Sequence, residues 1–171
     1  MNGATIVTQK TLGTNLADWK VVGSEDFDGD GRAELLWHNT TTNTVEIDSL
    51  GAGGFSYVGT PGYLDSTWSV ADIGDYNGDG KADILWKTSS NFYVEWVMNG
   101  AAVTSQKTLG TIPANWRLEG SGDYAGIGMD YLAWRDTNNL TFEIDSLSDA
   151  GLSKVSSFNL GSSGWTLVAG N

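Results

Sequence analysis

Internal repetition constrains the fold of this chain more than any other feature of its 171 residues. Tryptophans recur at intervals of 49, 48 and 49 residues, at Trp19, Trp68, Trp116 and Trp165. A second tryptophan follows each of the first three after 18 residues, at Trp37, Trp86 and Trp134. A fixed period of this length indicates one structural unit repeated along the chain.

Alternate units share longer identities than neighbouring units do. Residues 46–50 return as 143–147, residues 9–14 return as 106–111, and residues 1–4 return as 98–101. Identities of this length cannot arise by chance, so we take the unit as the building block of the fold.

Each unit is predicted to contain four short strands joined by turns. In the first unit the strands cover 19–24, 34–37, 44–50 and 55–59. The second strand is apolar on both faces, at Leu35 and Leu36, which predicts burial between two neighbouring sheets. In the third strand Val45 and Ile47 alternate with acidic residues, which predicts one buried face.

The composition agrees with an all-β fold, because helix-forming residues are scarce while Thr, Val, Trp, Tyr and Gly are abundant. Four antiparallel strands per unit are typical of β-propeller blades. We therefore predict one all-β repeat domain over 1–171. Its expected parts are an outer strand at 1–14, three complete four-stranded blades at 19–62, 68–110 and 116–160, and an inner strand at 165–171. A parallel array of β-modules and a β-sandwich are the alternatives, and the period makes both less favourable.

The recurring tryptophans are interpreted as packing between blades. Propellers usually contain four to eight blades, so three blades predict a partial ring, or a ring completed by oligomerisation. Open blade faces would expose apolar surface, which favours a homo-oligomer or the remainder of a longer propeller as partner.

Two acidic loops follow the first strand of the first two units. The first places carboxylates at positions 1, 3, 5 and 9, namely Asp26, Asp28, Asp30 and Glu34. The second places oxygen-bearing side chains at the same positions, namely Asp75, Asn77, Asp79 and Asp83. Oxygen ligands in this density suit a hard cation, and Ca²⁺ is the expected ion, with one site in each loop.

Further details of these loops agree with a metal site. Gly31 and Gly80, at position 6, permit a sharp bend with positive φ. The backbone carbonyls of Arg32 and Lys81, at position 7, are expected to complete the ligand shell. Crowded carboxylates are costly without a cation among them. The alternative is an Asp- and Gly-rich turn that needs no metal.

The third loop, which begins at Asp123, is degenerate. Ala125, Ile127 and Tyr131 replace the ligands at positions 3, 5 and 9. We expect no ion in this loop, and we expect Ile127 to pack where the ion would lie.

The sequence Asp-x-(Asp/Asn)-Gly-Asp-Gly-(Arg/Lys)-Ala-(Asp/Glu)-(Ile/Leu)-Leu-Trp, which ends at Trp37 and again at Trp86, resembles the FG-GAP/VCBS repeat. The resemblance implies a β-propeller that binds Ca²⁺ between the first two strands of its blades, as in integrin α-subunits. For bacterial members it implies extracellular or cell-surface proteins, often modules of adhesins, lectins or polysaccharide-active enzymes.

Charge and composition exclude several classes of protein. A net charge of −12 with nine Lys and Arg residues argues against binding to nucleic acid. No apolar run is long enough to span a membrane. The absence of cysteine excludes disulfides and thiolate chemistry. Weak Ca²⁺ sites fill where free Ca²⁺ is high, so an extracellular or cell-surface location is expected.

The sequence does not indicate an enzyme. His38 is the only histidine, and nothing near it resembles a catalytic triad or a histidine metal centre. Glu46, Glu95 and Glu143 are interpreted as equivalent positions of the third strand with a structural role.

The favoured function is a non-catalytic, calcium-stabilised binding or adhesion module for carbohydrate or cell-surface recognition, with a glycan or a surface protein as partner. Tyr63, Tyr76, Tyr93 and Tyr124 are candidate ligand contacts or packing residues. The alternatives are an assembly module that completes a propeller by self-association and an accessory domain of a polysaccharide-active enzyme.

Overall fold

The computed structural model describes residues 17–51, 53–148 and 151–161, and these residues form three antiparallel sheets of four strands. The first sheet contains β1 (Trp19–Glu25), β2 (Glu34–Asn39), β3 (Thr44–Gly51) and β4 (Gly54–Tyr63). The second contains β5 (Trp68–Gly74), β6 (Asp83–Thr88), β7 (Phe92–Asn99) and β8 (Ala102–Thr111). The third contains β9 (Trp116–Gly122), β10 (Tyr131–Asp136), β11 (Thr141–Ser148) and β12 (Gly151–Asn159). The extra strands expected at 1–14 and 165–171 lie outside the described residues.

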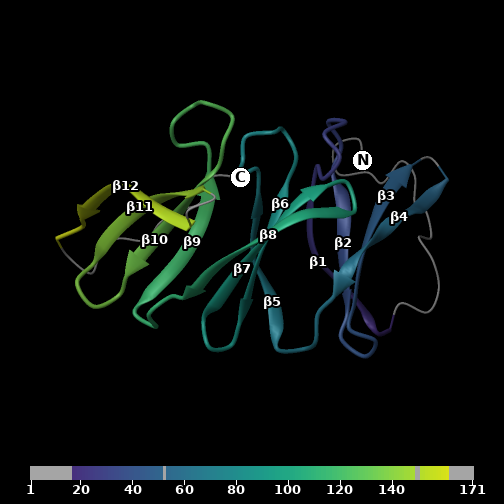
Figure 1. Ribbon diagram of the computed structural model, residues 1–171, viewed down its shortest axis with the longest axis horizontal. Coiled ribbons are helices and arrows are strands. Elements are labelled where there is room, and N and C mark those ends of the chain that lie inside the picture. Colours follow the sequence, from purple (N-terminus) through teal and green to yellow (C-terminus); the bar gives the residue numbers. More distant parts are fainter. Residues whose placement is uncertain (1–16, 52, 149–150, 162–171) are drawn as a thin grey trace, which may run out of the picture.

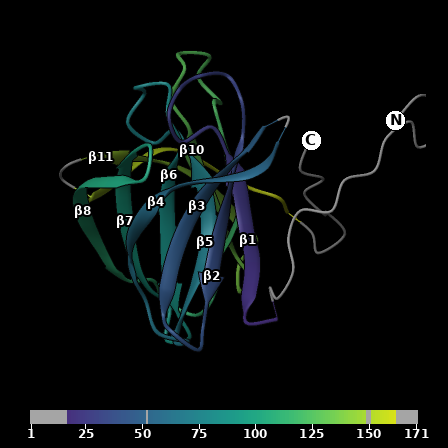
Figure 2. The same ribbon diagram turned by 90° about the vertical axis from the view of Figure 1, so that its right-hand side faces the viewer.

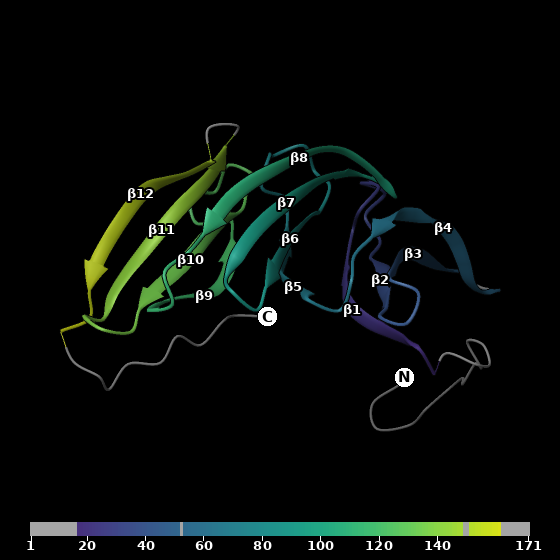
Figure 3. The ribbon, with the colours of Figure 1, turned by 60° about the horizontal axis from the view of Figure 1, so that its bottom comes forward.

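The three sheets stand beside one another in an open arc (Figure 1, Figure 3). The first strands of consecutive sheets, β1, β5 and β9, contact one another, and so do the last strands, β4, β8 and β12. Among the described strands, none of the first sheet contacts one of the third, so the arc is not closed into a ring. The prediction of an all-β fold with propeller-like blades is therefore confirmed. Within the described ranges, no helix is present that could cross a membrane.

Turns with local side-chain support join the second and third strands. Asn43 and Asn91 precede β3 and β7 with φ of 62° and 59°, a left-handed conformation that asparagine tolerates well. Before β11 the same conformation falls on Leu140, with φ of 60°. The carboxamide oxygen of Asn39 accepts hydrogen bonds from the backbone N–H groups of Thr41 and Thr42, which closes the first of these turns.

The core lies between the sheets. Between the first and second sheets, the fully buried Leu36, Val45 and Ile47 belong to the same cluster as Ile84 and Trp86. A separate cluster between the second and third sheets contains Tyr76, Leu85, Tyr93, Leu132, Trp134 and Leu147. Ile84 and Leu85 are adjacent but belong to different clusters, so the second strand of the middle sheet is buried on both faces, as predicted. In the first sheet Leu36 is buried, but Leu35 is only half-buried because no described sheet covers that face.

Two tryptophans of the second series, Trp86 and Trp134, pack between blades, as predicted, whereas Trp37 belongs to neither cluster and packs against Phe55 of its own sheet. Trp86 is fully buried against the first sheet, and Trp134 is 2% exposed against the second. The indole rings of Trp86 and Trp96 lie 5.4 Å apart, so two large aromatic side chains fill the first interface.

The predicted equivalence of Glu46, Glu95 and Glu143 is wrong. In the first and third sheets the buried tryptophan pairs with glutamate, as Trp37 with Glu46 and Trp134 with Glu143. In the second sheet Trp86 pairs with Val94, which places Glu95 on the opposite face, where it forms an ion pair with Lys107. The cause is a turn one residue shorter between β6 and β7, since a one-residue shift reverses every side chain.

Candidate metal centre

The two acidic loops and the degenerate third loop connect the first and second strands of their sheets. They follow β1, β5 and β9 and extend from the same end of the arc (Figure 1, Figure 2). Their last position is the first residue of the next strand in the acidic loops, at Glu34 and Asp83. The strand therefore determines where the carboxylate at position 9 lies, and the turn determines where the side chains at positions 1, 3 and 5 lie.

In the first loop, the aspartate at position 1 organises the backbone. Asp26 Oδ1 accepts a hydrogen bond of 2.7 Å from Gly29 N, and Asp26 Oδ2 accepts one of 2.7 Å from Gly31 N. Both glycines have positive φ, of 81° and 85°, as predicted for Gly31. Partial burial raises the pKa of Asp26, but the hydrogen bonds from Gly31, Gly29 and Asp30 outweigh it, and the pKa lies below its usual value.

Three of the predicted ligands lie together in this loop. Carboxylate oxygens of Asp26, Asp28 and Glu34 all lie within 4.8 Å of one another. Glu34 is 3% exposed, and its Oε2 accepts a hydrogen bond of 3.0 Å from Phe27 N. Burial, and then the charges of Asp28, Asp26 and Asp30, raise the pKa of Glu34. A cation among these oxygens would remove that repulsion.

Asp30, the predicted ligand at position 5, is not part of this group. Its Oδ1 accepts a hydrogen bond of 2.9 Å from Arg32 N, and its Oδ2 lies 3.7 Å from the exposed Arg32 guanidinium. The ligand role of the Arg32 and Lys81 carbonyls stays a prediction.

The second loop repeats the hydrogen bonds of the first. Asp75 accepts hydrogen bonds of 2.7 Å from Gly78 N and from Gly80 N, and Asn77 Oδ1 accepts one of 2.8 Å from Asp79 N. Position 3 is an asparagine here. The three positions that gather in the first loop therefore supply only two carboxylates in the second, at Asp75 and Asp83.

Asp83 is the most unusual side chain of the second loop. It is fully buried, its Oδ1 accepts a hydrogen bond of 2.8 Å from Met98 N, and its Oδ2 has no hydrogen-bond partner. Burial, followed by the charges of Glu95, Asp79 and Asp75, raises the pKa of Asp83 to about 7. A buried oxygen without a donor is the feature that a bound cation would satisfy.

The third loop keeps the hydrogen bonds of the turn although it lacks most of the predicted metal ligands. Asp123 still accepts hydrogen bonds from Ile127 N at 2.9 Å and from Gly128 N at 2.8 Å. These bonds form although positions 3, 5 and 9 have lost their ligands, so they do not by themselves indicate an ion. The expectation that Ile127 packs in the place of the ion is wrong, because Ile127 is 65% exposed.

The segment from the first acidic loop to the tryptophan of the second sheet matches a known family. Residues 26–86 match the FG-GAP-like repeat family. No curated protein and no solved structure matches this chain. The FG-GAP-like repeat spans both loops with their complete set of predicted ligands and ends at Trp86. It supports a propeller-type binding or adhesion module, a class that is typically non-catalytic.

The loops also join consecutive blades through hydrogen bonds, which sequence reasoning missed. The Asp26 carbonyl accepts a hydrogen bond of 2.8 Å from Ala82 N, at position 8 of the next loop. The Asp75 carbonyl accepts the equivalent bond, of 2.7 Å, from Asp130 N, and Asp130 Oδ2 accepts one of 3.0 Å from Asp75 N. The only sequence signal is that these residues occupy the same positions of consecutive loops.

Other candidate residues have structural roles. Tyr76 and Tyr93 are buried in the interface between the second and third sheets, so they are packing residues rather than ligand contacts. Tyr63 and Tyr124 are 72% and 54% exposed. His38 is buried, and its Nε2 lies 2.7 Å from the Leu64 carbonyl, a hydrogen bond that joins β2 to the segment after β4.

Proposed function

We propose that this protein is a non-catalytic binding and adhesion module, stabilised by Ca²⁺, that recognises carbohydrate on an extracellular or cell surface. The FG-GAP-like repeat and the propeller-like blades support a binding module. The observation that carries the calcium proposal is the burial of a carboxylate at position 9 of both acidic loops, at Glu34 and Asp83.

A buried carboxylate is stable only when charge or hydrogen bonds compensate its lost hydration. Within the first loop, Glu34 is surrounded by other carboxylates and by one backbone donor from Phe27. Within the second loop, Asp83 Oδ2 has no donor. Ca²⁺ accepts six to eight oxygen ligands and tolerates irregular geometry, so it suits an open loop with mixed carboxylate and carbonyl oxygens.

Such an ion would act on more than one blade. Asp26 holds the loop through its side chain and the next blade through its carbonyl. An ion bound to the Asp26 carboxylate therefore stabilises the contact with Ala82 as well. The rigid loops at this end of the arc then provide a preorganised surface for recognition, where propellers and other β-folds commonly bind their ligands.

A glycan array tests the proposed recognition. The protein is applied in Ca²⁺ and, in a parallel experiment, in EDTA. We expect binding to a restricted set of glycans that weakens in EDTA, because the loops lose their fixed conformation. An array without signal in Ca²⁺ would contradict the recognition of surface glycans.

A second function, assembly through the end faces of the arc, is favoured by exposed apolar side chains. On the outer face of the third sheet, Tyr124, Val155 and Phe158 are all more than half exposed, and Phe158 stacks on Phe142 at 5.4 Å. On the outer face of the first sheet, Val21 pairs with Trp37 and is 50% exposed. Apolar faces at both ends favour head-to-tail contact between copies.

Sedimentation velocity tests this assembly. We expect the protein to form a closed oligomer at micromolar concentration, and Phe158→Ser to shift it towards smaller species. A compact monomer at that concentration for the unmodified protein would contradict self-association.

A further inference from the structure

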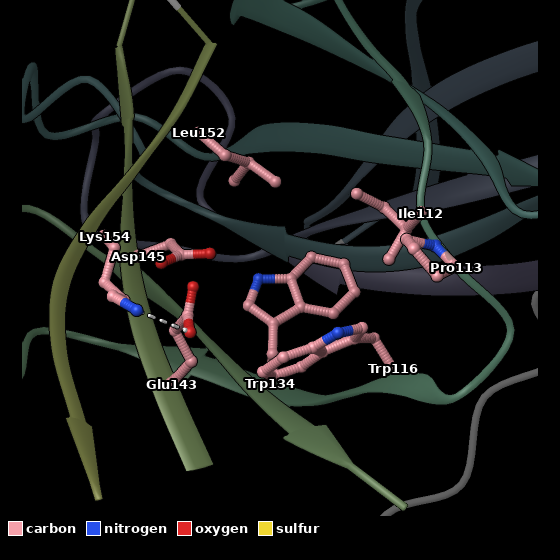
Figure 4. A pocket seen from close by; sticks show the side chains of 8 residues that line it. All are labelled: Ile112, Pro113, Trp116, Trp134, Glu143, Asp145, Leu152 and Lys154. Atoms are coloured by element: carbon pink, nitrogen blue, oxygen red, sulfur yellow. Dashed lines mark hydrogen bonds and ion pairs between the residues drawn. The ribbon is translucent and has the colours of Figure 1, made fainter. Parts of the chain in front are cut away.

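A pocket of about 320 Å³ opens between the third sheet and the segment that links it to the second sheet, away from the acidic loops. Its walls come from the segment between β8 and β9 and from all four strands of the third sheet (Figure 4). The residues that line it are Ile112, Pro113, Trp116, Trp134, Glu143, Asp145, Leu152 and Lys154. The volume lies at the lower end of the range for small-molecule sites.

The pocket exists because the two interfaces between blades are filled differently. In the second sheet, Trp96 pairs with Ile84, two residues before the buried Trp86, and its indole fills the space against the first sheet. A Cβ atom at Gly62 would lie only 2.9 Å from this ring, so the packing there is tight. In the third sheet the equivalent position, paired with Leu132, is occupied by the much smaller Asp145.

Two buried polar atoms in the pocket wall have no hydrogen-bond partner. They are the indole Nε1 of Trp134, which is a donor, and Oδ1 of Asp145, which is an acceptor when ionised. Asp145 is 7% exposed, and its carboxyl group points into the pocket towards Trp134 in Figure 4. Buried polar groups in native proteins are almost always satisfied, and an occupant that offers both an acceptor and a donor would satisfy these two atoms together.

The remaining polar groups of the pocket match the same chemistry. Lys154 Nζ lies 3.3 Å from Glu143 Oε2, and both side chains are accessible to solvent. Burial, and then the charge of Glu143, raise the pKa of Asp145 to about 6. Beside these groups, Trp116 and Leu152 supply apolar surface. Carboxylates, a lysine and an indole together offer acceptors, donors and a stacking face to one ligand.

We propose that this pocket binds a sugar ring, with hydroxyl groups held by Trp134 Nε1 and Asp145 and an apolar ring face against Trp116. A hydroxyl group both donates and accepts, so it satisfies the indole N–H and the carboxylate, whereas an ammonium group satisfies only the carboxylate. The site rests on the proposed carbohydrate recognition, and it places one sugar-binding site away from the acidic loops rather than on them. It also assigns the acidic pair Glu143 and Asp145 to binding.

The test follows the indole N–H signals of the ¹⁵N-labelled protein by NMR. Methyl glycosides of galactose, mannose and fucose are the probes, each titrated into the millimolar range. The Trp134 signal is identified by its loss in Trp134→Phe. We expect it to shift with saturation for at least one glycoside, and calorimetry to give an affinity at least about tenfold weaker for Trp134→Phe, the loss typical of one hydrogen bond.

Asp145→Trp introduces the residue type that the second sheet has at the equivalent position, Trp96. We expect this variant to fill the pocket and to abolish glycoside binding. Trp86→Phe is the matched control, because it removes a buried indole from the interface without this pocket, and it should keep the affinity. Thermal melts check that each variant is folded. If Asp145→Trp does not fold, the affinity that calorimetry gives for Trp134→Phe decides whether the glycoside binds in this pocket.

Three results would overturn the site. They are no shift with any glycoside, a shift confined to other indoles, and a shift with methylammonium chloride alone. The glycan array separates this proposal from the broader one. If Asp145→Trp still gives a signal on the array, the protein recognises carbohydrate but not through this pocket. If the Trp134 signal shifts with a glycoside while the array gives no signal, the pocket binds sugar but surface glycans are not recognised.

Discussion

Removal of Ca²⁺ with EDTA is expected to lower the melting temperature by about 10–20 °C relative to saturating Ca²⁺. An ion that binds only the folded state adds about 2.7 kcal/mol per site when its free concentration is about 100 times Kd. Two sites then contribute about 5 kcal/mol, and each kcal/mol shifts the melting temperature of a domain of this size by about 2–4 °C. Differential scanning calorimetry in Ca²⁺ and in EDTA measures the shift. Equal melting temperatures in the two buffers would reject a structural ion.

Asp83→Asn is expected to stabilise the protein in the absence of metal and to destabilise it in the presence of Ca²⁺. Asparagine can still accept the hydrogen bond from Met98 N, but it has no buried negative charge. The variant should therefore melt at a higher temperature than the unmodified protein in EDTA and at a lower one in Ca²⁺. An isosteric variant that melts lower under both conditions would indicate a structural role for Asp83 without metal.

Metal analysis with matched variants locates the ions. We expect about two Ca²⁺ per chain, and about one after Glu34→Gln, which removes the buried carboxylate that both acidic loops have at position 9. Asp123→Asn is the control in the degenerate third loop, and it should leave the count and the response to EDTA unchanged. Loss of an ion in Asp123→Asn would show that the third loop also binds metal.

Trp86→Ala is expected to destabilise the protein by about 3–5 kcal/mol, the range observed when a fully buried aromatic side chain is truncated. Trp86 is fully buried and packs against Trp96 and the first sheet, so the substitution leaves a large cavity between two blades. Urea unfolding followed by circular dichroism measures the free energy of unfolding.

Leu50→Ala is the matched control for this prediction. Leu50 lies on β3 and is 53% exposed, so its truncation should change the free energy of unfolding by less than about 1 kcal/mol. If Trp86→Ala cost no more than Leu50→Ala, the blades would not depend on this interface for stability.

Much of this fold could be predicted from local sequence. The spacing of Trp19, Trp68 and Trp116 counts the units, and the apolar pair Ile84 and Leu85 indicates a strand with a sheet on either side. Both signals can be recognised in the sequence alone, because the pattern of a strand and the period of a repeat do not depend on contacts between distant residues. The acidic loops can be predicted for the same reason, since the Asp26 carboxylate accepts hydrogen bonds from backbone groups only a few residues away.

The relations between blades could not be predicted in this way. Glu95 matched Glu46 and Glu143 in sequence, but a turn shorter by one residue placed it on the other face of its sheet. The hydrogen bond between Ala82 N and the Asp26 carbonyl joins residues of different blades, and it depends on how one sheet is placed against the next.

The sequence by itself therefore determined the repeat, the four strands of each unit and the residues of the acidic loops. Only the tertiary structure decided which carboxylates gather, with Asp26, Asp28 and Glu34 together and Asp30 turned towards Arg32. It also decided that Asp145, where the second sheet has Trp96, leaves a pocket beside Trp134. The physical reason is that strand and turn preferences act over a few residues, whereas a site is formed by register and sheet packing, which bring distant residues together.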